Sequence, residues 1–534
     1  MLVHAALTAS ASLTPFNGGA RQWGNLFFPG SRTNFGAYSF LFGGMRRRGL
    51  PIIVQGASQS NGPVGEVSDD ETARRTYVWP NGKNPRVCIL GGGFGGLYTA
   101  LRLESLEWAP EKKPQILLFD QSERFVFKPM LYELLSGEVD VWEIAPRFSD
   151  LLRNTSVQFF QDRVKLLDTY DYEGINASTR SSCGGVVHLE SGLMVEYDWL
   201  VLALGAAGKV DLVPGAAEFA LPFSTLEDAY MVEKRLRELE RKYFGKDTPI
   251  VVAVVGCGYA GVELAATVSE RLKDKGVVHA IGRDTTILPT APPGNREASM
   301  KVLSSRKIQL SLGYSVRSIT RCIEFESSDR ETTNNSGAAQ DPDRLVLELL
   351  SSEGGLQVQT LHVDLVLWTV GSKPLLPQIE RNWLPLIEQG QAETDETLRV
   401  KGHPCIFAIG DSSALRDSSG RRLPATAQVA FQQADFAGWN LWAAINNRPL
   451  LPFRFQNLGE MMTLGRSDAA VTPSFLEGLT LEGPVGHTAR KLAYLARLPT
   501  DEHRLKVGIS WLLKSTVDSV ASLQSTLAEV LSRP

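Results

Sequence analysis

The chain has 534 residues, which is enough for two or three domains with substantial cores. Its formal net charge of −4 gives no global reason to expect a nucleic-acid partner. The sequence contains no run of about 18 consecutive apolar residues, so we expect no transmembrane helix and only peripheral contact with a membrane.

The first 80 residues differ in composition from the rest of the chain. No acidic residue and no lysine precedes Glu66, while arginines occur among Ser, Ala and Gly. This composition is typical of an organelle transit peptide, and a plain disordered tail is the alternative. We therefore expect residues 1–80 to be a transit peptide and leader, with the folded protein beginning near residue 80.

A glycine-rich fingerprint follows the first predicted strand, Arg86–Leu90. The first loop, Gly91–Gly96, leads into a helix expected at Leu97–Leu106. Glycines at these positions permit a tight turn and close approach of a pyrophosphate to the helix N-terminus. Asp120, which closes the next strand (Gln115–Phe119), is placed to bind the ribose hydroxyls.

A second fingerprint of the same kind begins 165 residues later (256 − 91). The strand Ile250–Val255 precedes the second loop, Gly256–Gly261, and a helix is expected at Val262–Leu272 before the strand Val277–Ile281. One such fingerprint is weak evidence, but two in the same context predict two bound dinucleotides. This pairing indicates a flavin that is reduced by a nicotinamide coenzyme.

The end of the strand Val277–Ile281 bears on which nicotinamide coenzyme binds. NADH-preferring sites keep an acid there for the ribose 2′-hydroxyl, whereas this chain has Gly282 followed by Arg283. The missing carboxylate and the arginine favour the 2′-phosphate of NADPH, or use of both coenzymes. Asp284 leaves NADH open, because an alignment shifted along the strand would restore an acid.

The remaining pattern completes an α/β fold. Further apolar strands are expected at 198–205, Val363–Trp368 and Cys405–Ile409, and the polar stretch Glu326–Asp343 is expected to be a loop. Strands that alternate with helices predict parallel sheets, here in two Rossmann-like domains. About the last 80 residues do not continue this pattern.

The first loop, Asp198–Gly205 and Cys405–Asp411 together resemble the two-dinucleotide flavoproteins. Phe125–Tyr132 and Pro424–Gln433 narrow the resemblance to the type II NAD(P)H:quinone dehydrogenases, which are single-chain, non-pumping FAD enzymes. This resemblance covers roughly residues 84–460. The arginine-containing leader and the ending 489–499 resemble most the plastid type-C plant members. The resemblance implies electron transfer from NADPH or NADH to a membrane-soluble quinone such as demethylphylloquinone or plastoquinone. It also implies a chloroplast location, at plastoglobules or thylakoids, with the mitochondrion as a further location.

The resemblance, taken with the loops, assigns roles to individual residues. Glu263 is expected near the nicotinamide and flavin, where it orients the nicotinamide or passes protons, and Gln428 and Gln432 line the quinone side. The residues expected to bind FAD are Gly91, Gly93, Phe94, Gly95, Gly96, Asp120, Lys128, Pro129, Gly205, Asp411 and Gln428. Those expected to bind the nicotinamide coenzyme are Gly256, Gly258, Tyr259, Gly261, Glu263, Arg283 and Gly371.

The family fold implies that the nicotinamide domain is inserted in the FAD domain. We expect FAD-domain segments at 84–215 and 376–455, with the quinone-side motif in the second. The nicotinamide domain is expected at 216–375. Residues 456–534 would form a C-terminal region for membrane association or dimer formation.

The C-terminal region shows a helical apolar stripe. Leu513, Val517, Val520, Leu527 and Leu531 fall on one helical face. Trp511 and the upstream basic residues Arg490, Lys491, Arg497 and Lys506 suit a lipid surface. The alternative is a helix that packs on the protein's own core or on a second copy of the chain.

Other flavoprotein classes remain open. The five scattered cysteines have no C-x-x-C spacing, which argues against a dithiol enzyme, and the seven histidines have no metal-ligand spacing, so we expect no metal. Distant cysteines such as Cys183 and Cys405 leave a sulfide:quinone reductase as an alternative. A further alternative is an FAD-containing assembly or signalling protein with incidental turnover.

Overall fold

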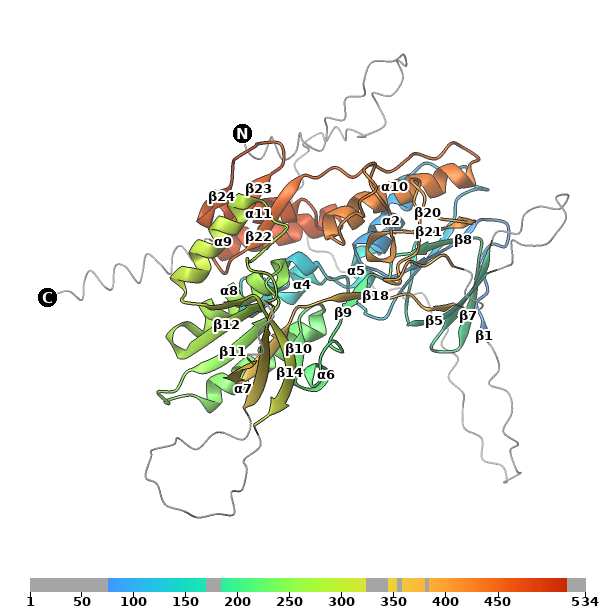
Figure 1. Ribbon diagram of the computed structural model, residues 1–534. Helices are drawn as coiled ribbons and strands as arrows, with labels where there is room; N and C mark the ends of the chain where they lie inside the picture. The colour runs from blue at the N-terminus through green and yellow to red at the C-terminus, as the bar shows by residue number, and fades with distance from the viewer. Residues whose placement is uncertain (1–74, 170–183, 323–343, 353–357, 380–383, 516–534) are drawn as a thin grey trace, which may run out of the picture. The chain divides into compact units, whose positions relative to one another are not determined.

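The computed structural model describes residues 75–169, 184–322, 344–352, 358–379 and 384–515. These residues belong to one compact unit, Arg74–Pro534. Figure 1 shows that unit with its helices and strands labelled.

A six-stranded sheet forms the first nucleotide-binding half. Its central strands are parallel, and only the edge strand β20 is antiparallel to its neighbour. In spatial order the strands are β20 (Arg399–Val400), β21 (His403–Ala408), β8 (Trp199–Leu202), β2 (Arg86–Leu90), β3 (Gln115–Asp120) and β4 (Gln158–Gln161).

The two faces of this sheet are covered differently. Because side chains alternate along a strand, Val87 and Ile89 of β2 enter the core beneath helices α2 (Phe94–Ser105) and α10 (Ala427–Ile445). Cys88 and Leu90 enter a second core on the opposite face. A five-stranded sheet covers that face, made of β1 (Arg75–Thr76), β7 (Leu193–Tyr197), β6 (Gly185–Leu189), β5 (Val164–Thr169) and β19 (Gln378–Ile379) (Figure 1).

The second nucleotide-binding half repeats this plan, and its strands lie between β8 and β21 in the chain. Its parallel sheet contains β10 (Ala220–Pro222), β17 (Leu365–Trp368), β11 (Ile250–Val255), β12 (Gly276–Gly282) and β13 (Gln309–Leu312). Helices α7 (Leu226–Lys242), α8 (Tyr259–Leu272) and α9 (Pro293–Ser305) belong to this half. The opposite face meets an antiparallel sheet of β14 (Tyr314–Arg321), β15 (Leu345–Ser351) and β16 (Val358–Val363).

Shorter elements link the two halves. The connecting segments pair with each other as antiparallel strands, β9 (Ala206–Gly208) and β18 (Ser372–Pro374). Between β3 and β4 the chain forms η1 (Lys128–Met130), α3 (Tyr132–Ser136), α4 (Val141–Ile144) and α5 (Phe148–Leu151). The other short helices are α6 (Ala216–Phe219), η2 (Lys273–Lys275) and η4 (Gly410–Ser412). One hydrophobic cluster runs through both halves, so their helix-side cores are continuous.

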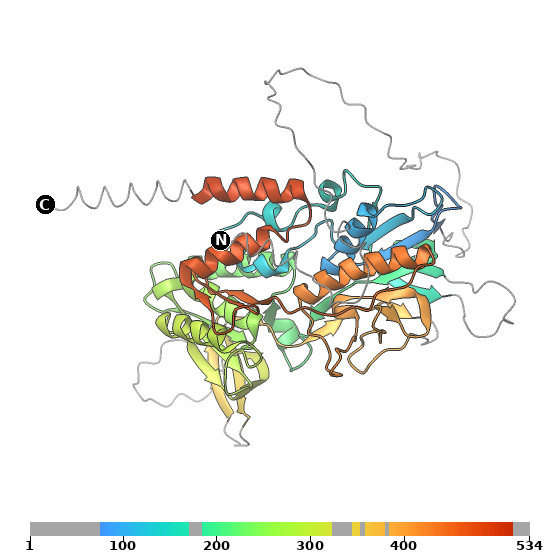
Figure 2. The ribbon, with the colours of Figure 1, turned by 90° about the horizontal axis from the view of Figure 1, so that it is seen from above.

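The C-terminal region does not continue the alternation of parallel strands and helices, as the sequence predicts. Strands β22 (Gly459–Thr463), β23 (Ala469–Pro473) and β24 (Leu481–Glu482) form an antiparallel sheet, followed by helix α11 (Gly483–Leu495) and a helix over residues 501–515. Figure 2 shows these two helices in red near the C-terminal end. No helix among the described residues is long and apolar enough to cross a membrane.

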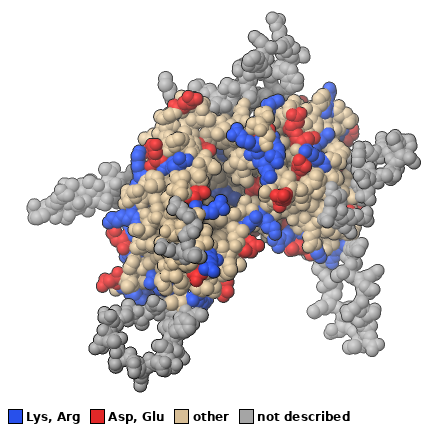
Figure 3. All heavy atoms as spheres, viewed as in Figure 1, with Lys and Arg blue, Asp and Glu red and all other residues tan. Residues whose placement is uncertain are grey.

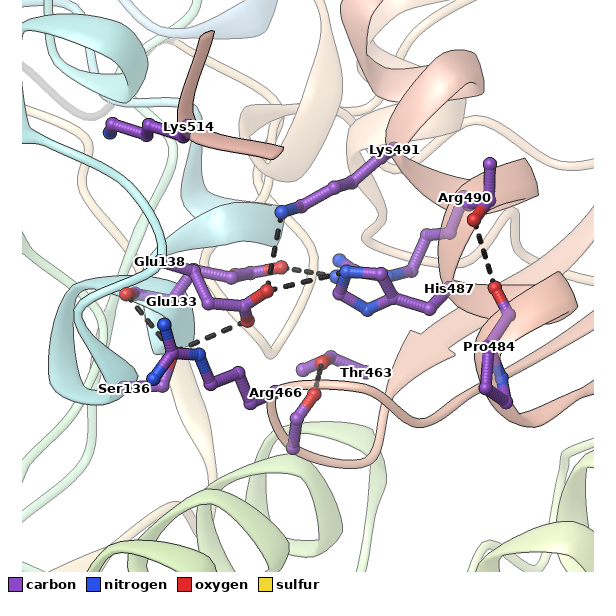
Figure 4. A network of polar contacts seen from close by, with 12 residues as sticks. Glu133, Ser136, Glu138, Thr463, Arg466, Pro484, His487, Arg490, Lys491 and Lys514 are labelled. Atoms are coloured by element: carbon purple, nitrogen blue, oxygen red, sulfur yellow. Dashed lines mark hydrogen bonds and ion pairs between the residues drawn. The ribbon is translucent and has the colours of Figure 1, made fainter. Parts of the chain in front are cut away.

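Helix α11 is held by a buried ion pair. The Arg490 side chain is 0% exposed and binds Glu133 of α3. Next to this pair, His487 and Lys491 reach from α11 to Glu138, at 3.3 and 3.2 Å (Figure 4). A buried charge left without its partner would be strongly destabilising, so these contacts fix α11 on α3.

This burial corrects the sequence-based view of the basic residues near α11. Arg490 cannot face lipid, because its guanidinium lies inside the protein against Glu133. Trp511, expected at a lipid interface, is half-buried, and Lys491 lies over its ring at 5.5 Å. Both side chains therefore pack on the protein's own core.

Basic and acidic side chains are interspersed on the face shown in Figure 3, with no field of one sign across it.

The elements predicted from sequence are found with small shifts. The strands Arg86–Leu90 and Ile250–Val255 have the predicted bounds, and α2 and α8 begin three residues before the predicted helices. Strand β1 places the first paired backbone at Arg75, a few residues before the expected start. The polar stretch 326–343 lies outside the described residues.

Candidate functional site

Three glycines of the first loop, Gly91, Gly93 and Gly96, occupy the fingerprint positions, and each is required for a different structural reason. Gly91 has a φ of +99°, which is costly for any other residue. A Cβ on Gly96 would lie 1.8 Å from the Gly91 carbonyl oxygen, so this glycine permits the helix to touch the loop. A Cβ on Gly93 would meet nothing within 4 Å. Open space in front of Gly93, at the start of α2, is where a pyrophosphate would approach the backbone.

The second loop repeats this arrangement. Gly256 has a φ of +111°, and a Cβ on Gly261 would lie 1.8 Å from the Gly256 carbonyl oxygen. A Cβ added to Gly258 would again meet nothing within 4 Å, and this glycine directly precedes α8. The chain therefore has two equivalent strand–loop–helix turns, each open at its middle glycine.

Asp120 lies at the first turn as predicted. Its carboxylate accepts hydrogen bonds from the Gly92 N–H at 2.6 Å and the Ser122 N–H at 2.8 Å. Burial raises the pKa of Asp120, and the two N–H groups and Lys128 partly offset this rise. The carboxylate is thus fixed at the end of β3, beside the loop that would hold the pyrophosphate.

Asp411 lies in η4, at the other end of the same site. It is half-buried, and no described residue donates a hydrogen bond to its carboxylate. Burial raises its pKa, whereas the charge of Lys128 lowers it. The charge of Lys128 therefore acts on both carboxylates. An unsatisfied carboxylate at this position fits a hydroxyl-rich ribityl chain.

Other residues expected at FAD lie on the elements that follow the first loop and the strand β8. Phe94 packs edge-on to Phe125 and Phe127, at 5.4 and 5.2 Å between ring centroids, while Pro129 is half-buried in η1. Gly95 faces Ile409, and Gly205 turns the chain after β8 with a φ of +74°. The donor set, the open glycine and the unsatisfied carboxylate together fit FAD.

Strand register decides which residue of the second half corresponds to Asp120. In the first half, Phe119 of β3 pairs with Leu90, the last residue of β2. In the second half, Ile281 of β12 pairs in the same way with Val255, the last residue of β11. Asp120 and Gly282 are the final residues of β3 and β12, so they are equivalent. Asp284 lies two residues further on and is therefore not the counterpart of Asp120.

An exposed basic side chain follows Gly282. Arg283 is exposed, and its backbone carbonyl accepts a hydrogen bond from the Ser352 hydroxyl at 3.2 Å. Gly371 turns the chain after β17 with a φ of +76°. Tyr259, at the start of α8, hydrogen bonds to Glu460 of β22, so this tyrosine ties the second turn to the C-terminal region.

Glu263 lies on α8 in a buried environment. It is 8% exposed, and its carboxyl accepts a hydrogen bond from the Thr463 N–H at 2.9 Å. Burial raises the pKa of Glu263 to about 8, although the Thr463 N–H, the Arg490 charge and Tyr132 each lower it. At neutral pH the group therefore holds a proton for most of the time.

Gln428 and Gln432 lie on successive turns of α10 and hold the same segment of backbone. The Gln428 amide donates to the Gly459 carbonyl at 3.1 Å and accepts from the Leu458 N–H at 3.2 Å. The Gln432 amide donates to the Gln456 carbonyl at 2.8 Å and accepts from its N–H at 3.0 Å. Both glutamines thus fix residues 456–459 against α10.

Sequence reasoning missed the residues around Glu263 that come from distant segments. Tyr132 and Glu133 of α3, Thr463 of β22 and Arg490 of α11 surround it. Glu133, a charged residue in the otherwise apolar run Leu131–Leu135, carried a sequence signal of burial, whereas Arg490, in the polar run 487–491, carried none. Among the described residues, no group of three or more His, Cys, Asp or Glu could hold a metal ion.

Of the two cysteines in the sulfide-reductase alternative, Cys405 is disulfide-bonded. Cys405 is buried on β21, at 4% exposure, and Cys183 lies outside the described residues.

Gly258, which is open, and Gly261, which is crowded, give a testable distinction. We expect Gly258→Ala to fold and retain its flavin but to bind the nicotinamide coenzyme about tenfold or more weakly, since the added methyl group meets only the ligand's space. Gly261→Ala should instead lower thermal stability, because its methyl group collides with the Gly256 carbonyl. Flavin absorbance, thermal unfolding and coenzyme titration measure these effects. Unchanged coenzyme affinity in Gly258→Ala would contradict this assignment.

The chain matches known proteins over most of its length. Residues 85–434 match the family model described as pyridine nucleotide-disulphide oxidoreductase. The chain is 62% identical over 531 residues to the alternative NAD(P)H-ubiquinone oxidoreductase C1, chloroplastic/mitochondrial, of Arabidopsis thaliana, covering 99% of both chains. It is 42% identical over 434 residues to the demethylphylloquinone reductase NdbB of a Synechocystis strain, covering 81% of this chain and 97% of the relative.

A solved structure has the same fold. The NDH2 of Plasmodium falciparum in complex with NADH superposes with a TM-score of 0.61 at 18% identity, covering 80% of this chain and 97% of that one. With the two nucleotide turns in place and both relatives matched over most of their length, the chain belongs to the pyridine nucleotide-disulphide oxidoreductase family and, within it, to the type II NAD(P)H:quinone oxidoreductases.

Proposed function

We propose that this protein transfers electrons from NADPH, through FAD, to a membrane-soluble quinone without pumping protons. The observation that carries this proposal is the pair of equivalent nucleotide turns, of which only one ends in a carboxylate. The names of the two relatives, an NAD(P)H-ubiquinone oxidoreductase and a demethylphylloquinone reductase, support the quinone as acceptor. A prenylated naphthoquinone or plastoquinone is the proposed substrate class.

FAD would occupy the first turn. The open backbone at Gly93 would receive its pyrophosphate, Asp120 its adenosine ribose and Asp411 its ribityl chain. When bound, FAD supplies a centre that accepts hydride and passes electrons on. The role of the chain is to hold and orient this group, with the charge of Lys128 acting on both carboxylates.

The nicotinamide coenzyme would occupy the second turn. Gly282 offers no carboxylate to repel a 2′-phosphate, and the exposed Arg283 side chain follows it directly. An arginine can bind a phosphate with two parallel hydrogen bonds, which supports NADPH over NADH.

The quinone side would be built around α10. Gln428 and Gln432 hold residues 456–459, and this segment continues into β22, whose Thr463 N–H binds Glu263. Glu263 would hold a proton at its carboxyl group for delivery as the quinone is reduced. In this proposal the two glutamines position the wall of the quinone site.

A lipid surface would supply the quinone, and the helix over residues 501–515 is the proposed contact. Its inner face is occupied: His503 and Val507 are buried, and Ser510 and Lys514 bind Glu143 at 2.6 and 2.9 Å. Its outer face exposes Leu505, Ile509, Leu512 and Leu513, at 66, 51, 70 and 61%. An exposed apolar face on a helix whose other face is packed suits a membrane interface. Of the predicted stripe, the positions beyond Leu513 lie outside the described residues.

The proposed location is the chloroplast, at plastoglobules or thylakoids, with the mitochondrion as a second site. The leader's composition supports an organelle, and the Arabidopsis relative is named chloroplastic/mitochondrial.

Half-reactions of the purified FAD-loaded protein test the proposed function. Under anaerobic conditions we expect NADPH to reduce the flavin about tenfold faster than NADH at limiting coenzyme, because Arg283 binds the 2′-phosphate. Prenylated naphthoquinone, plastoquinone and ubiquinone analogues, added in parallel, should reoxidise the flavin. A flavin that NADPH does not bleach, or a reduced flavin that no quinone reoxidises, would contradict the proposal.

The pKa of Glu263 gives a pH dependence. Because its pKa is raised to about 8, the neutral acid is present below that pH and is lost above it, so quinone reduction should slow as the pH rises through about 8. Glu263→Gln should lower this rate about 100-fold and abolish the alkaline decline. Glu270→Gln, on the same helix but partly exposed, is the matched control and should keep the wild-type profile. An alkaline decline that persists in Glu263→Gln would rule out this role.

Vesicle flotation tests the lipid contact. We expect Leu505→Ser/Leu512→Ser to bind vesicles of phosphatidylglycerol and phosphatidylcholine at least about tenfold more weakly than the wild type, since each leucine loses apolar burial. Glu502→Ser/Lys506→Ser, on the same helix, is the control. Wild-type protein that does not float, but forms a dimer sensitive to the leucine changes, would show instead that a second copy covers this face.

A further inference from the structure

The two nucleotide turns differ at a matched pair of positions. At the first turn, the second loop residue is Gly92 and the strand ends in Asp120, whose carboxylate accepts the Gly92 N–H at 2.6 Å. At the second turn, Cys257 takes the place of Gly92, and Gly282 takes the place of Asp120. The first turn therefore combines the acid Asp120 with Gly92, whereas the second turn combines Gly282, which has no acid, with Cys257.

The Cys257 side chain occupies the space that a side chain at position 282 would need. A Cβ on Gly282 would lie 2.9 Å from both Cβ and Sγ of Cys257. Rotation can move the sulfur but not the Cβ. The Cys257 backbone is itself held, because its carbonyl accepts the Leu288 N–H at 2.9 Å. A residue larger than glycine at 282 therefore collides with a fixed atom.

Backbone conformation does not impose this glycine. Gly282 is not among the described residues with a positive φ, so other residues can adopt its backbone angles. Leu312, the next nearest group, would be at an ordinary contact distance of 3.4 Å from a Cβ added at this position. The obstacle to a side chain at 282 is thus Cys257.

The effect of Cys257 on the site is steric. Its side chain is 8% exposed and belongs to the hydrophobic core. Burial, with a smaller contribution from Asp284, raises the pKa of the Cys257 thiol to about 12, so the group is neutral at physiological pH. It therefore shapes the site without adding charge.

We propose that Cys257 is a specificity-determining residue: its side chain keeps position 282 free of a carboxylate and so leaves the coenzyme site open to a 2′-phosphate. Arg283, exposed next to Gly282, then meets an anion with no carboxylate at position 282. This inference rests on the proposed use of NADPH, but the steric part stands on the geometry of the two positions alone.

Thermal unfolding of the FAD-loaded full chain tests the steric part. Gly282→Ala should lower the Tm by about 5 °C, because the added methyl group overpacks a fixed neighbour. The same change in a Cys257→Gly background should lower it by at most about 1 °C, since the collision is gone. Equal Tm losses in both backgrounds would overturn the inference.

Nucleotide binding tests the consequence for specificity. The probes are 2′,5′-ADP and 5′-AMP, titrated into the FAD-loaded protein by calorimetry. Cys257→Gly/Gly282→Glu should fold and shift the ratio of the two affinities toward 5′-AMP by about 100-fold, because the new carboxylate repels the 2′-phosphate and binds the ribose hydroxyls. Gly282→Glu alone should lose affinity for both probes, because its side chain has no room. A double variant with the wild-type ratio would overturn the proposal.

The same titrations separate this inference from the proposed function. If wild-type protein binds both probes equally while the Tm losses differ between backgrounds, the NADPH preference fails and the steric coupling holds. If wild-type protein prefers 2′,5′-ADP while the Tm losses are equal, the preference holds and the role of Cys257 fails.

Discussion

The contact between the first and third glycines of each loop is the constraint on which both nucleotide sites depend. The helix can begin against the end of the strand only because Gly96 and Gly261 have no side chain to strike the carbonyl oxygen of the first glycine. This close packing aims each helix N-terminus at the space before the middle glycine. Helix geometry then fixes the positions of the residues further along each helix, including Glu263 on α8.

The C-terminal region completes the site that these turns begin. Strand β22 donates a backbone N–H to Glu263, and α11 contributes the buried Arg490 that binds Glu133. Because two acids and one cation share this interior, the charge of Glu263 depends on where α11 docks. Burial dominates, which keeps Glu263 protonated near neutral pH. Segments far apart in the chain thus set the acidity of one carboxyl.

The same region connects the interior to the surface. The amides of Gln428 and Gln432 hold residues 456–459, which lead into β22. The following helix packs one face on Glu143 and exposes leucines on the other. An exposed apolar face and a buried proton-holding glutamate within one region fit the proposed reduction of a lipid-borne quinone. This is why a peripheral helix and a buried acid belong to one proposal.

The sequence by itself determined the two turns, the strands before them and the identity of Asp120 as the acid of the first site, because these depend on local spacing and on glycine's backbone freedom. It could not decide between Gly282 and Asp284, since that choice depends on strand register. The partners of Glu263 and the burial of Arg490 also came only from tertiary structure. They bring together α3, α8, β22 and α11, whose proximity no local pattern encodes. Packing between distant segments therefore sets the protonation of Glu263 and the burial of Arg490. Local geometry alone sets the two strand–loop–helix turns.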